Sequence, residues 1–535
     1  MASPVNQSAT LSFGKSATPG VDSVADLGTI GLDDTTTNLA LTTTLRAGQS
    51  YSFSFAWTSA SAPTISLVDG TGKATKVNMA KGFTVPTSGT YTLKFDYGYS
   101  LKTYANLANL KIYGTGQLPT KSGDKSVDAL LRGGTTYWWH DSDAAVSSSD
   151  NAITDKLKEL ASGSSLHTLT YSFLNAAPTS QAAGMSNFQA MSDEQKAAVR
   201  AAFDYYEQII DVDFQETDAG AGNINFGTNA QDASAGYAFL PNSTGAKDQT
   251  YLYLANNAAT NSGANLQAGK YGWETILHEI GHTLGLKHPG NYNAGGGGTP
   301  GPYLSKGQDS HQFSIMSYND NTFTTGVRST TAEVLDVAAL QYLYGANDDG
   351  STAVSGKFTF NAGQTYLQTL WSKTGTDSID LTGLLASSKI DLNAGTFSSI
   401  SISGAVDALS YSGNNNVAIA YGSHINSVKL SDKAGVAESV TLNTAYLDGA
   451  FDTVSNFEAT ADTIGISKAR FKGVSAKTIE FGAAATNGKT RILVNSTTGE
   501  VFYTAKGNGG TAQKIAQVST KNNVVLTGTN FSVVA

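Results

Sequence analysis

The chain has 535 residues, more than one ordinary hydrophobic core accommodates, so we expect two or three domains. Asp, Glu, Lys and Arg make up 14% of the residues, the formal net charge is −9, and there is no cysteine. This composition gives no basic field for a nucleic-acid backbone and excludes disulfides, thiolate metal sites and cysteine nucleophiles. No apolar run reaches the roughly eighteen residues that a membrane-spanning helix needs, so no membrane span is expected.

The first part of the chain alternates apolar and polar residues with the period of a β-strand. Aromatic and aliphatic residues recur at every second position in three segments: 51–57, 65–67 and 91–97. Turn residues such as Asp69-Gly70 and Ser88-Gly89 separate these segments. We therefore predict an N-terminal β-sandwich over residues 1–119.

Mixed helix and strand patterns follow in residues 120–345. Ser192 and Gln195 have the spacing of a capping box, and an apolar helical stripe continues to Ile210. Further elements are expected as short strands at 224–226 and 251–254, and as helices at 273–284 and 333–344, the last ending at Gly345. This pattern indicates an α+β domain with a mixed sheet and long helices.

After Gly345 the helical periodicity ends, and short apolar alternations separated by Gly, Asn, Asp and Ser continue to the end of the chain. This pattern predicts an all-β C-terminal domain over residues 346–535. The fold class expected for the whole chain is therefore multidomain, with α+β and all-β parts.

Three of the chain's seven histidines cluster in the sequence: His278, His282 and His288. His278 and His282 are four residues apart on a predicted helix, so their rings project from the same face. Gly285 lets the backbone leave the helix through a positive-φ turn, and His288 then returns to the metal as a third ligand. Three neutral ligands leave one position open, which is typical of a catalytic zinc site.

Glu279 follows the first histidine directly and lies about 100° around the helix from it. From there its carboxylate can take a proton from a metal-activated water without binding the metal itself. The three histidines could instead be ordinary surface or core residues on a helix. The Gly and the third His at the spacing that a metal requires favour the zinc site, with Glu279 as its general base.

The pattern H-E-x-x-H-x-x-G-x-x-H, followed by Pro289, resembles the serralysins within the metzincin clan. The segment Ser314–Tyr318 is similar to the Met-turn of that family, in which Met316 would lie under the metal. Three further segments resemble the family in the same order: 166–173, 236–241 and 336–347. The resemblance covers roughly residues 126–347. It implies that Tyr318 is an additional, switchable metal ligand that stabilises the oxyanion of the tetrahedral intermediate.

This resemblance implies a secreted, extracellular zinc endopeptidase that hydrolyses internal bonds of protein or peptide substrates. Association with the cell surface is an alternative to a freely diffusing extracellular enzyme. We expect an extended substrate to add to the edge of the sheet at strand 251–254. The last residues, 530–535, resemble the uncleaved signal that one-step bacterial export transporters read, and they fit a final β-strand equally well.

The C-terminal region departs from the family pattern, in which Gly- and Asp-rich nonapeptides hold calcium in a β-roll. No such nonapeptide is present, and Thr504 and Lys506 stand where the family usually has acidic residues. Calcium requires several oxygen ligands, mostly carboxylates. We therefore expect at most an incomplete set of calcium sites.

A rival hypothesis from another class is a surface-layer or adhesin-like structural protein that carries an inactive protease domain. The Ser-, Thr-, Gly- and Asn-rich composition and the two flanking β regions favour it. The intact set of Glu279, three histidines and Tyr318 favours the enzyme. The other histidines are isolated in the sequence and are expected to be structural or surface residues: His140, His167, His311 and His424.

Overall fold

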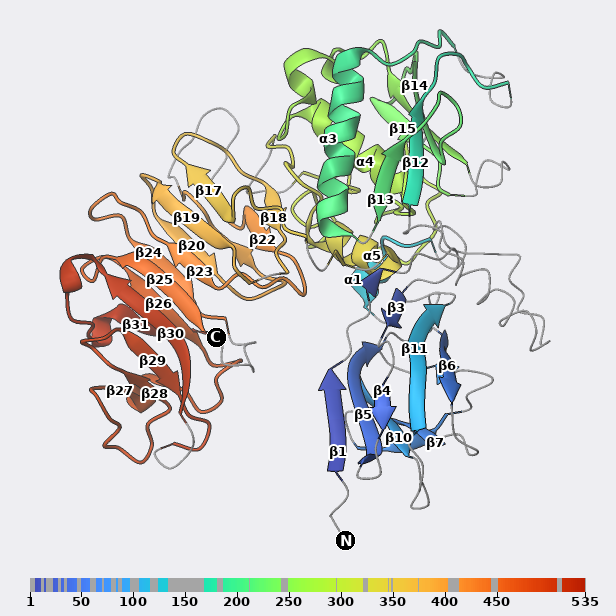
Figure 1. Ribbon diagram of the computed structural model, residues 1–535. Coiled ribbons are helices and arrows are strands. Elements are labelled where there is room, and N and C mark those ends of the chain that lie inside the picture. Colours follow the sequence, from blue (N-terminus) through green and yellow to red (C-terminus); the bar gives the residue numbers. More distant parts are fainter. Residues whose placement is uncertain are drawn as a thin grey trace.

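The computed structural model of the chain is shown in Figure 1. Before residue 116 it describes the strands β1–β11 and a few residues beside them, and it then describes residues 124–132. From residue 168 to 534 the description is continuous except for these gaps: 180–185, 211, 242–248, 295, 321–325, 345, 348–349, 374, 403–412, 444–450 and 508–511. The expected helix end at Gly345 and the histidines His140 and His167 lie outside the described residues.

The N-terminal strands form two sheets, with the orders β1-β5-β10-β7-β8 and β2-β3-β11-β6-β9, and β4 also pairs with β11. Their bounds are β1 (Val5–Thr10), β2 (Gly14–Lys15), β3 (Ser23–Asp26), β4 (Ile30–Leu32), β5 (Thr36–Leu45), β6 (Ser50–Trp57), β7 (Thr64–Val68), β8 (Ala74–Lys76), β9 (Phe83–Thr84), β10 (Gly89–Asp96) and β11 (Ala105–Thr115). The alternation expected from the sequence is present in β10, where Tyr91, Leu93 and Phe95 are buried and Lys94 is exposed.

The middle of the chain builds a five-stranded sheet with the order β13-β12-β14-β16-β15. The strands are β12 (Thr168–Phe173), β13 (Asp213–Glu216), β14 (Ile224–Asn229), β15 (Gly236–Ala238) and β16 (Thr250–Ala255). The helices are α1 (Lys125–Asp128), α3 (Asp193–Ile209), α4 (Tyr271–Thr283) and α5 (Val334–Tyr344), with short 3-10 turns η1 (Ala259–Asn261) and η2 (Gly263–Leu266). All strands are parallel except β15, which runs antiparallel to β16.

Helix α3 begins where the sequence predicts, because Ser192 and Gln195 cap it reciprocally. Its apolar stripe packs on the sheet, with the ring of Phe203 stacked 4.4 Å from that of Tyr171. The hydroxyl of Tyr206 donates to the carbonyl of Leu277 on α4 at 2.7 Å. This contact joins α3 to the helix that carries the histidines.

The expectation that strand 251–254 forms the edge of the sheet is wrong. These residues belong to β16, which lies between β14 and β15 and is buried along its whole length. The edge strand is the short β15, whose other side has no paired strand among the described residues. A strand of three residues is too short to show a period in the sequence.

The C-terminal region contains no α-helix among its described residues, as expected, and it forms a two-sheet roll. One sheet has parallel neighbours β17 (Lys357–Asn361), β19 (Ser378–Gly383), β23 (Ser427–Lys429), β25 (Asp452–Phe457) and β30 (Gln513–Thr520). The other has β20 (Ser388–Asp391), β24 (Glu438–Thr441), β26 (Thr463–Ser467) and β31 (Phe531–Val534). The chain alternates between the sheets, and one continuous apolar core fills the space between them.

The remaining strands of this region complete the two ends of the roll: β18 (Gln368–Leu370), β21 (Phe397–Ser398), β22 (Val417–Ile419), β27 (Ile479–Phe481), β28 (Ile492–Val494) and β29 (Glu500–Tyr503). The 3-10 turns are η3 (Ala476–Thr478), η4 (Lys521–Asn523) and η5 (Gly528–Asn530). Trp371 and Ala418 at the β18 end belong to the apolar core of the middle region. The hydroxyl of Thr369 donates to the buried carboxylate of Glu333 at 2.9 Å. The roll therefore packs directly on the part of the chain that carries the histidines.

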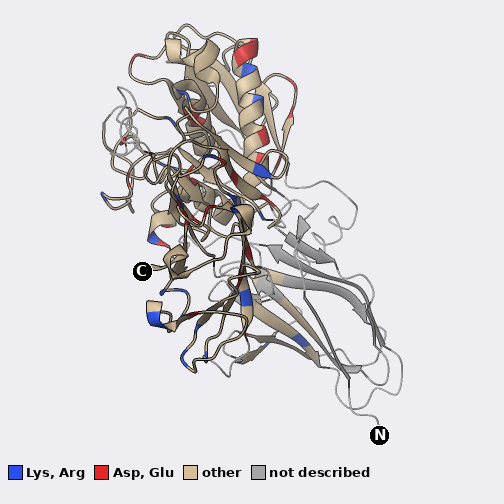
Figure 2. Ribbon diagram, turned by 90° about the vertical axis from the view of Figure 1, so that its left-hand side faces the viewer, with Lys and Arg blue, Asp and Glu red and all other residues tan. Residues whose placement is uncertain are grey.

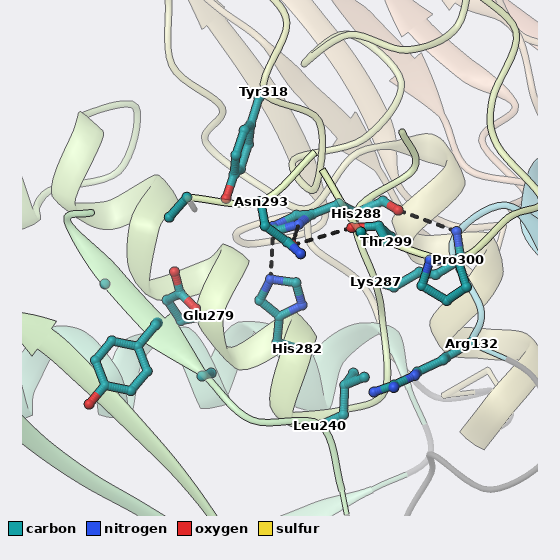
Figure 3. Close-up of a pocket in the computed structure, with 15 residues that line it drawn as sticks. Arg132, Leu240, Glu279, His282, Lys287, His288, Asn293, Thr299, Pro300 and Tyr318 are labelled. Carbon is teal, nitrogen blue, oxygen red and sulfur yellow. Dashed lines mark hydrogen bonds between the residues drawn. The ribbon is translucent and has the colours of Figure 1, made fainter. Parts of the chain in front are cut away.

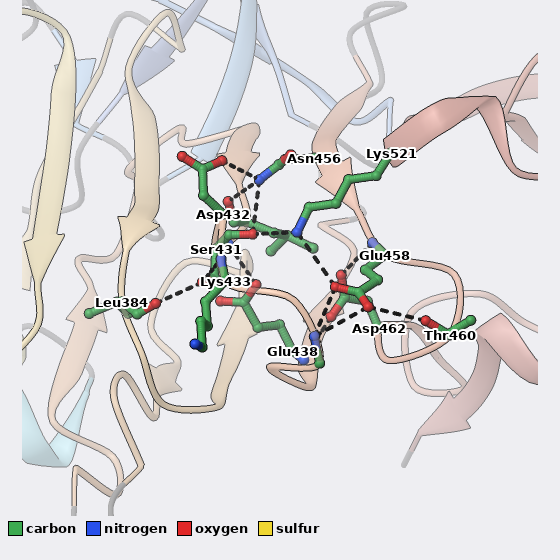
Figure 4. Close-up of polar contacts among 12 residues, drawn as sticks. Leu384, Ser431, Asp432, Lys433, Glu438, Asn456, Glu458, Thr460, Asp462 and Lys521 are labelled. Carbon is green, nitrogen blue, oxygen red and sulfur yellow. Dashed lines mark hydrogen bonds and ion pairs between the residues drawn. The ribbon is translucent and has the colours of Figure 1, made fainter.

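Side-chain hydrogen bonds connect successive turns of the roll (Figure 4). Ser431 Oγ donates to the carbonyl of Leu384 at 2.7 Å, and Asn456 Nδ2 donates to the carbonyl of Ser431 at 2.9 Å. Lys521 Nζ donates to the same Ser431 carbonyl at 2.8 Å and lies 3.6 Å from Glu458 Oε2. We call these residues, Ser431, Asn456, Glu458 and Lys521, the turn ladder.

In the view of Figure 2, Lys and Arg are few and lie scattered among Asp and Glu along the described ribbon. This distribution agrees with the low content of charged residues in the sequence. Among the described helices, none combines the length and the apolar character that a membrane crossing requires.

Candidate metal centre

Helix α4 presents the histidines to a cleft because its opposite side is firmly buried. Trp273, Ile276, Leu277 and Ile280 are between 0% and 7% exposed and belong to the core of the middle region. His278 and His282, one turn apart, are only partly buried. The amphipathic pattern predicted from the sequence therefore sets the direction of both rings.

The turn after α4 brings His288 back to the same point. Gly285 has φ of 103°, the left-handed region that its position after the helix requires. The amide of Leu286 then donates to the carbonyl of Gly281 at 2.9 Å and closes the helix end. His288 Nε2 lies 3.1 Å from the Nε2 atoms of both His278 and His282. The structure thus brings together the three histidines that the sequence singles out.

The outer nitrogen of each ring is held by an oxygen acceptor. His278 Nδ1 lies 2.7 Å from the carbonyl oxygen of Ile315, and His282 Nδ1 lies 2.7 Å from that of Leu286. His288 Nδ1 lies 2.8 Å from the amide oxygen of Asn293 and 3.0 Å from the carbonyl of Tyr292. Because carbonyl oxygens accept only, each Nδ1 carries the proton and each Nε2 presents a lone pair to the common centre.

The lone pair on Nε2 of His288 faces those of His278 and His282 at 3.1 Å each, and such lone pairs repel unless a cation lies among them. Zinc–nitrogen bonds of roughly 2.0–2.1 Å at tetrahedral angles place nitrogens about 3.3 Å apart, close to this spacing. The Nδ1 contacts to oxygen are the arrangement that orients histidine ligands in metal sites. Among the described residues, this is the one group of His, Cys, Asp or Glu side chains arranged to hold an ion. The donor set fits zinc.

The environment keeps the three rings neutral, as metal binding requires. Burial, followed by the neighbouring His282 and His288, lowers the pKa of His278 well below its usual range. Burial also lowers the pKa of His282 to about 3 and lowers the pKa of His288. The site therefore binds no proton where a cation could bind near neutral pH.

Glu279 lines the cleft beside the histidines and is 5% exposed. Burial raises the pKa of its carboxyl to about 8. Its Oε2 has no hydrogen-bond partner among the described residues. A Cβ at Gly236 of the edge strand would lie 3.0 Å from Glu279 Cγ, so β15 passes directly beside this carboxylate. The unpartnered oxygen and the raised pKa suit a group that exchanges protons near neutral pH.

The turn 314–318 supports the histidines from below, as the Met-turn resemblance implies. Met316 is fully buried, and a Cβ at Gly281 of α4 would lie 3.0 Å from its sulfur. Asp336, at the start of α5, accepts from Ser314 Oγ at 2.6 Å and from the amide of Ile315 at 2.7 Å. Because the Ile315 carbonyl binds His278 Nδ1, Asp336 fixes that histidine through one intervening residue.

Tyr318 stands over the histidines with its hydroxyl directed into the cleft (Figure 3). Its ring centre is 4.6 Å from that of His288 and 4.8 Å from that of Tyr292. Tyr292 is itself anchored by a hydrogen bond from its hydroxyl to Asp309 at 2.6 Å. Burial, then the charge of Glu279, raises the pKa of Tyr318 to about 12, so the phenol remains a hydrogen-bond donor.

Two hollows of about 360 and 410 Å³ adjoin the histidines. Both are lined by Gly236, Glu279 and Tyr318, so they form two halves of one cleft that meet at these residues.

His311 lines the larger half beside Glu274, although it stands apart from the other histidines in the sequence. The sequence reasoning also assigned no role to Asn293 or Asp336. A carboxylate inside the apolar run of α5 is the signal that could have identified Asp336.

Comparisons with known proteins agree with this geometry. The family model described as metallo-peptidase family M12B, reprolysin-like, matches residues 179–289. Metallopeptidase AprA of Pseudomonas marginalis is 33% identical over 324 residues, which cover 56% of this chain and 62% of the relative. Serralysins of Proteus mirabilis and Photorhabdus laumondii are 34% and 31% identical over 43% of this chain and 53% and 52% of their own lengths. The chain thus spans about half to three-fifths of the length of these relatives.

Proposed function

From the premise that the chain carries a metalloprotease region of the serralysin-type metzincin kind, we propose that the protein is a secreted zinc endopeptidase that cleaves internal bonds of proteins. The observation that carries the proposal is the convergence of three Nε2 lone pairs beside a buried, unpartnered carboxylate. We assign His278, His282 and His288 as ligands and Glu279 as general base. Tyr318 is the fourth, exchangeable ligand.

Zinc, when bound by the histidines, supplies a Lewis acid that polarises the scissile carbonyl and acidifies the attacking water. Glu279 takes the proton of that water and passes it to the leaving amine. The Tyr318 hydroxyl donates a hydrogen bond to the developing oxyanion. The raised pKa of Tyr318 keeps its phenol protonated as a donor. The raised pKa of Glu279 makes its carboxylate a stronger base toward the water and its carboxylic acid a proton donor to the leaving amine near neutral pH.

The substrate adds as an extended strand to β15, whose outer side is open among the described residues and which passes beside Glu279. This strand takes the place of segment 251–254 in the sequence-based hypothesis. Main-chain hydrogen bonds to β15 would hold the scissile bond beside the histidines regardless of side chains. Such binding suits an enzyme that acts on many protein sequences.

The division into residues 1–119, 120–345 and 346–535 remains our proposal for the domains, with a sandwich, a metzincin domain and a roll without calcium repeats. Export by a one-step bacterial transporter also remains a proposal, as does a location outside the cell. The first and last sheets described above support the assignment of the two flanking domains as all-β.

The decisive test replaces Glu279 by Gln. The variant keeps the histidines and should still bind one zinc ion, whereas casein cleavage should fall by at least about a thousandfold because the general base is lost. Zinc content and casein cleavage are measured on the same preparation. Retained turnover would remove Glu279 from the mechanism, and an inactive wild-type protein that binds zinc would favour the structural rival.

A further inference from the structure

The two halves of the cleft carry different charges. Apart from histidines and the shared Glu279, the smaller half is lined by two cations, Arg132 and Lys287. The larger half is lined by Glu274, Asp320 and Arg328. Since Glu279 and Tyr318 stand where the halves meet, a bound peptide would place opposite sides of its scissile bond in different electrostatic surroundings.

The cations of the smaller half have no carboxylate partner within the described part of the chain. Lys287 is 3% exposed, and its Nζ donates to the carbonyls of Ala129, His288 and Pro302. Arg132 is exposed, and Figure 3 shows its side chain beside Leu240 at the rim of this half. The Lys287 ammonium also lies 5.6 Å from the centre of the Tyr303 ring. A buried ammonium whose partners are carbonyl dipoles and an aromatic ring, with no carboxylate, leaves a net positive field in the hollow.

The cation of the larger half is neutralised. Arg328 Nη1 lies 3.1 Å from Glu274 Oε1, and its guanidinium stacks 4.7 Å above the ring of Tyr271. Asp320 adds a second carboxylate at the rim, with its side chain 44% exposed and 3.6 Å from His311 Nδ1. Apart from its histidines and the shared Glu279, this half is lined by one more carboxylate than cations.

The edge strand gives the substrate a direction. Antiparallel pairing is slightly more stable than parallel pairing, so a peptide on the open side of β15 runs opposite to it. The smaller half is lined by Tyr237, Ala238 and Leu240, toward the C-terminal end of β15, and the larger half by residues 233–236. The N-terminal part of the substrate therefore lies in the cationic half.

We propose that the cleft selects peptides with an acidic side chain before the scissile bond and a neutral or basic side chain after it. Arg132 at the rim and Lys287 in the wall attract the acidic side chain, and Asp320 disfavours a second acid on the other side. This inference rests on the endopeptidase function proposed above. It adds a substrate class to that function.

The test uses fluorogenic peptides that differ only by Glu, Gln or Lys at each of the three positions before the bond. At one or more of these three positions, kcat/KM should be about three- to tenfold higher for the Glu peptide than for the Lys peptide, as expected for a partly screened charge pair. Arg132→Glu should reverse this ratio, and Arg132→Gln should reduce it. Lys477→Glu, the same charge change at an exposed position of the roll, should leave it unchanged.

Casein cleavage is followed in parallel for each variant, so that the two proposals fail differently. Absence of casein cleavage by the wild-type protein would overturn the endopeptidase function and this inference with it. Casein cleavage without a preference for Glu before the bond, or with the same preference in Arg132→Glu, would overturn the inference alone.

Discussion

The metal centre and the roll hold neighbouring segments together by opposite means. At the metal centre, α4, the following turn and the Met-turn meet where three lone pairs point inward, so a cation completes the contact. In the roll, the turn ladder joins successive turns through donors of the chain itself, and the ammonium of Lys521 lies beside the carboxylate of Glu458. One region of the chain can therefore have the metal-site geometry expected of a protein family while another region is stabilised by contacts of its own.

The comparison predicts that two kinds of chelator act differently. Removal of zinc should abolish casein cleavage, a loss of more than about a thousandfold, because no side chain replaces the Lewis acid. Removal of calcium should change the thermal unfolding temperature by less than about 2 °C, because side chains already bridge the turns of the ladder. Activity and circular dichroism are recorded with a zinc-selective and a calcium-selective chelator. Unfolding of the roll without calcium would contradict the comparison.

A smaller effect is expected when the support of the metal centre is weakened. Asp336→Asn keeps the shape of the side chain but replaces one of the oxygens that accept from Ser314 and Ile315. The Ile315 carbonyl should then hold His278 less firmly, and zinc affinity should fall by about ten- to a hundredfold. Competition with a chromophoric chelator measures this affinity.

Asp380→Asn in the roll is the matched control for this substitution. Asp380 also accepts from a backbone amide and a hydroxyl, both from Thr382, but it does not touch the metal centre. Its replacement should leave zinc affinity unchanged. Equal losses in both variants would show that Asp336 acts through general stability and does not position His278.

The sequence predicted the features that depend on short spacings. The capping box at Ser192, the turn at Gly285 and the histidine spacing each involve residues within about one to three turns of each other, and the structure shows the expected geometry. A helix or a tight turn fixes the relative positions of such residues by itself. For this reason the candidate zinc centre could be assembled from the sequence alone.

Features that depend on tertiary contacts were not predictable in this way. The edge strand β15 is only three residues long, and its position follows from its pairing with β16. His311 is isolated in the sequence, yet the fold places it beside Glu274, 37 residues earlier. Lys521 and Ser431 are 90 residues apart and meet only because the roll stacks its turns. Periodicity in the sequence contains no information on such distant pairs.

The smallest expected effect concerns the turn ladder. Lys521→Met keeps the apolar stem of the side chain but removes the donor to the Ser431 carbonyl and the cation beside Glu458, both in a partly buried setting. Local stability of the turns should fall by about 1–2 kcal/mol, which increases the rate of amide hydrogen exchange in residues 430–462 by about five- to thirtyfold. Lys477→Met, at an exposed position, should leave exchange unchanged. If both variants exchange alike, Lys521 does not hold the turns together, and the contrast with the cation-dependent metal centre loses its physical basis.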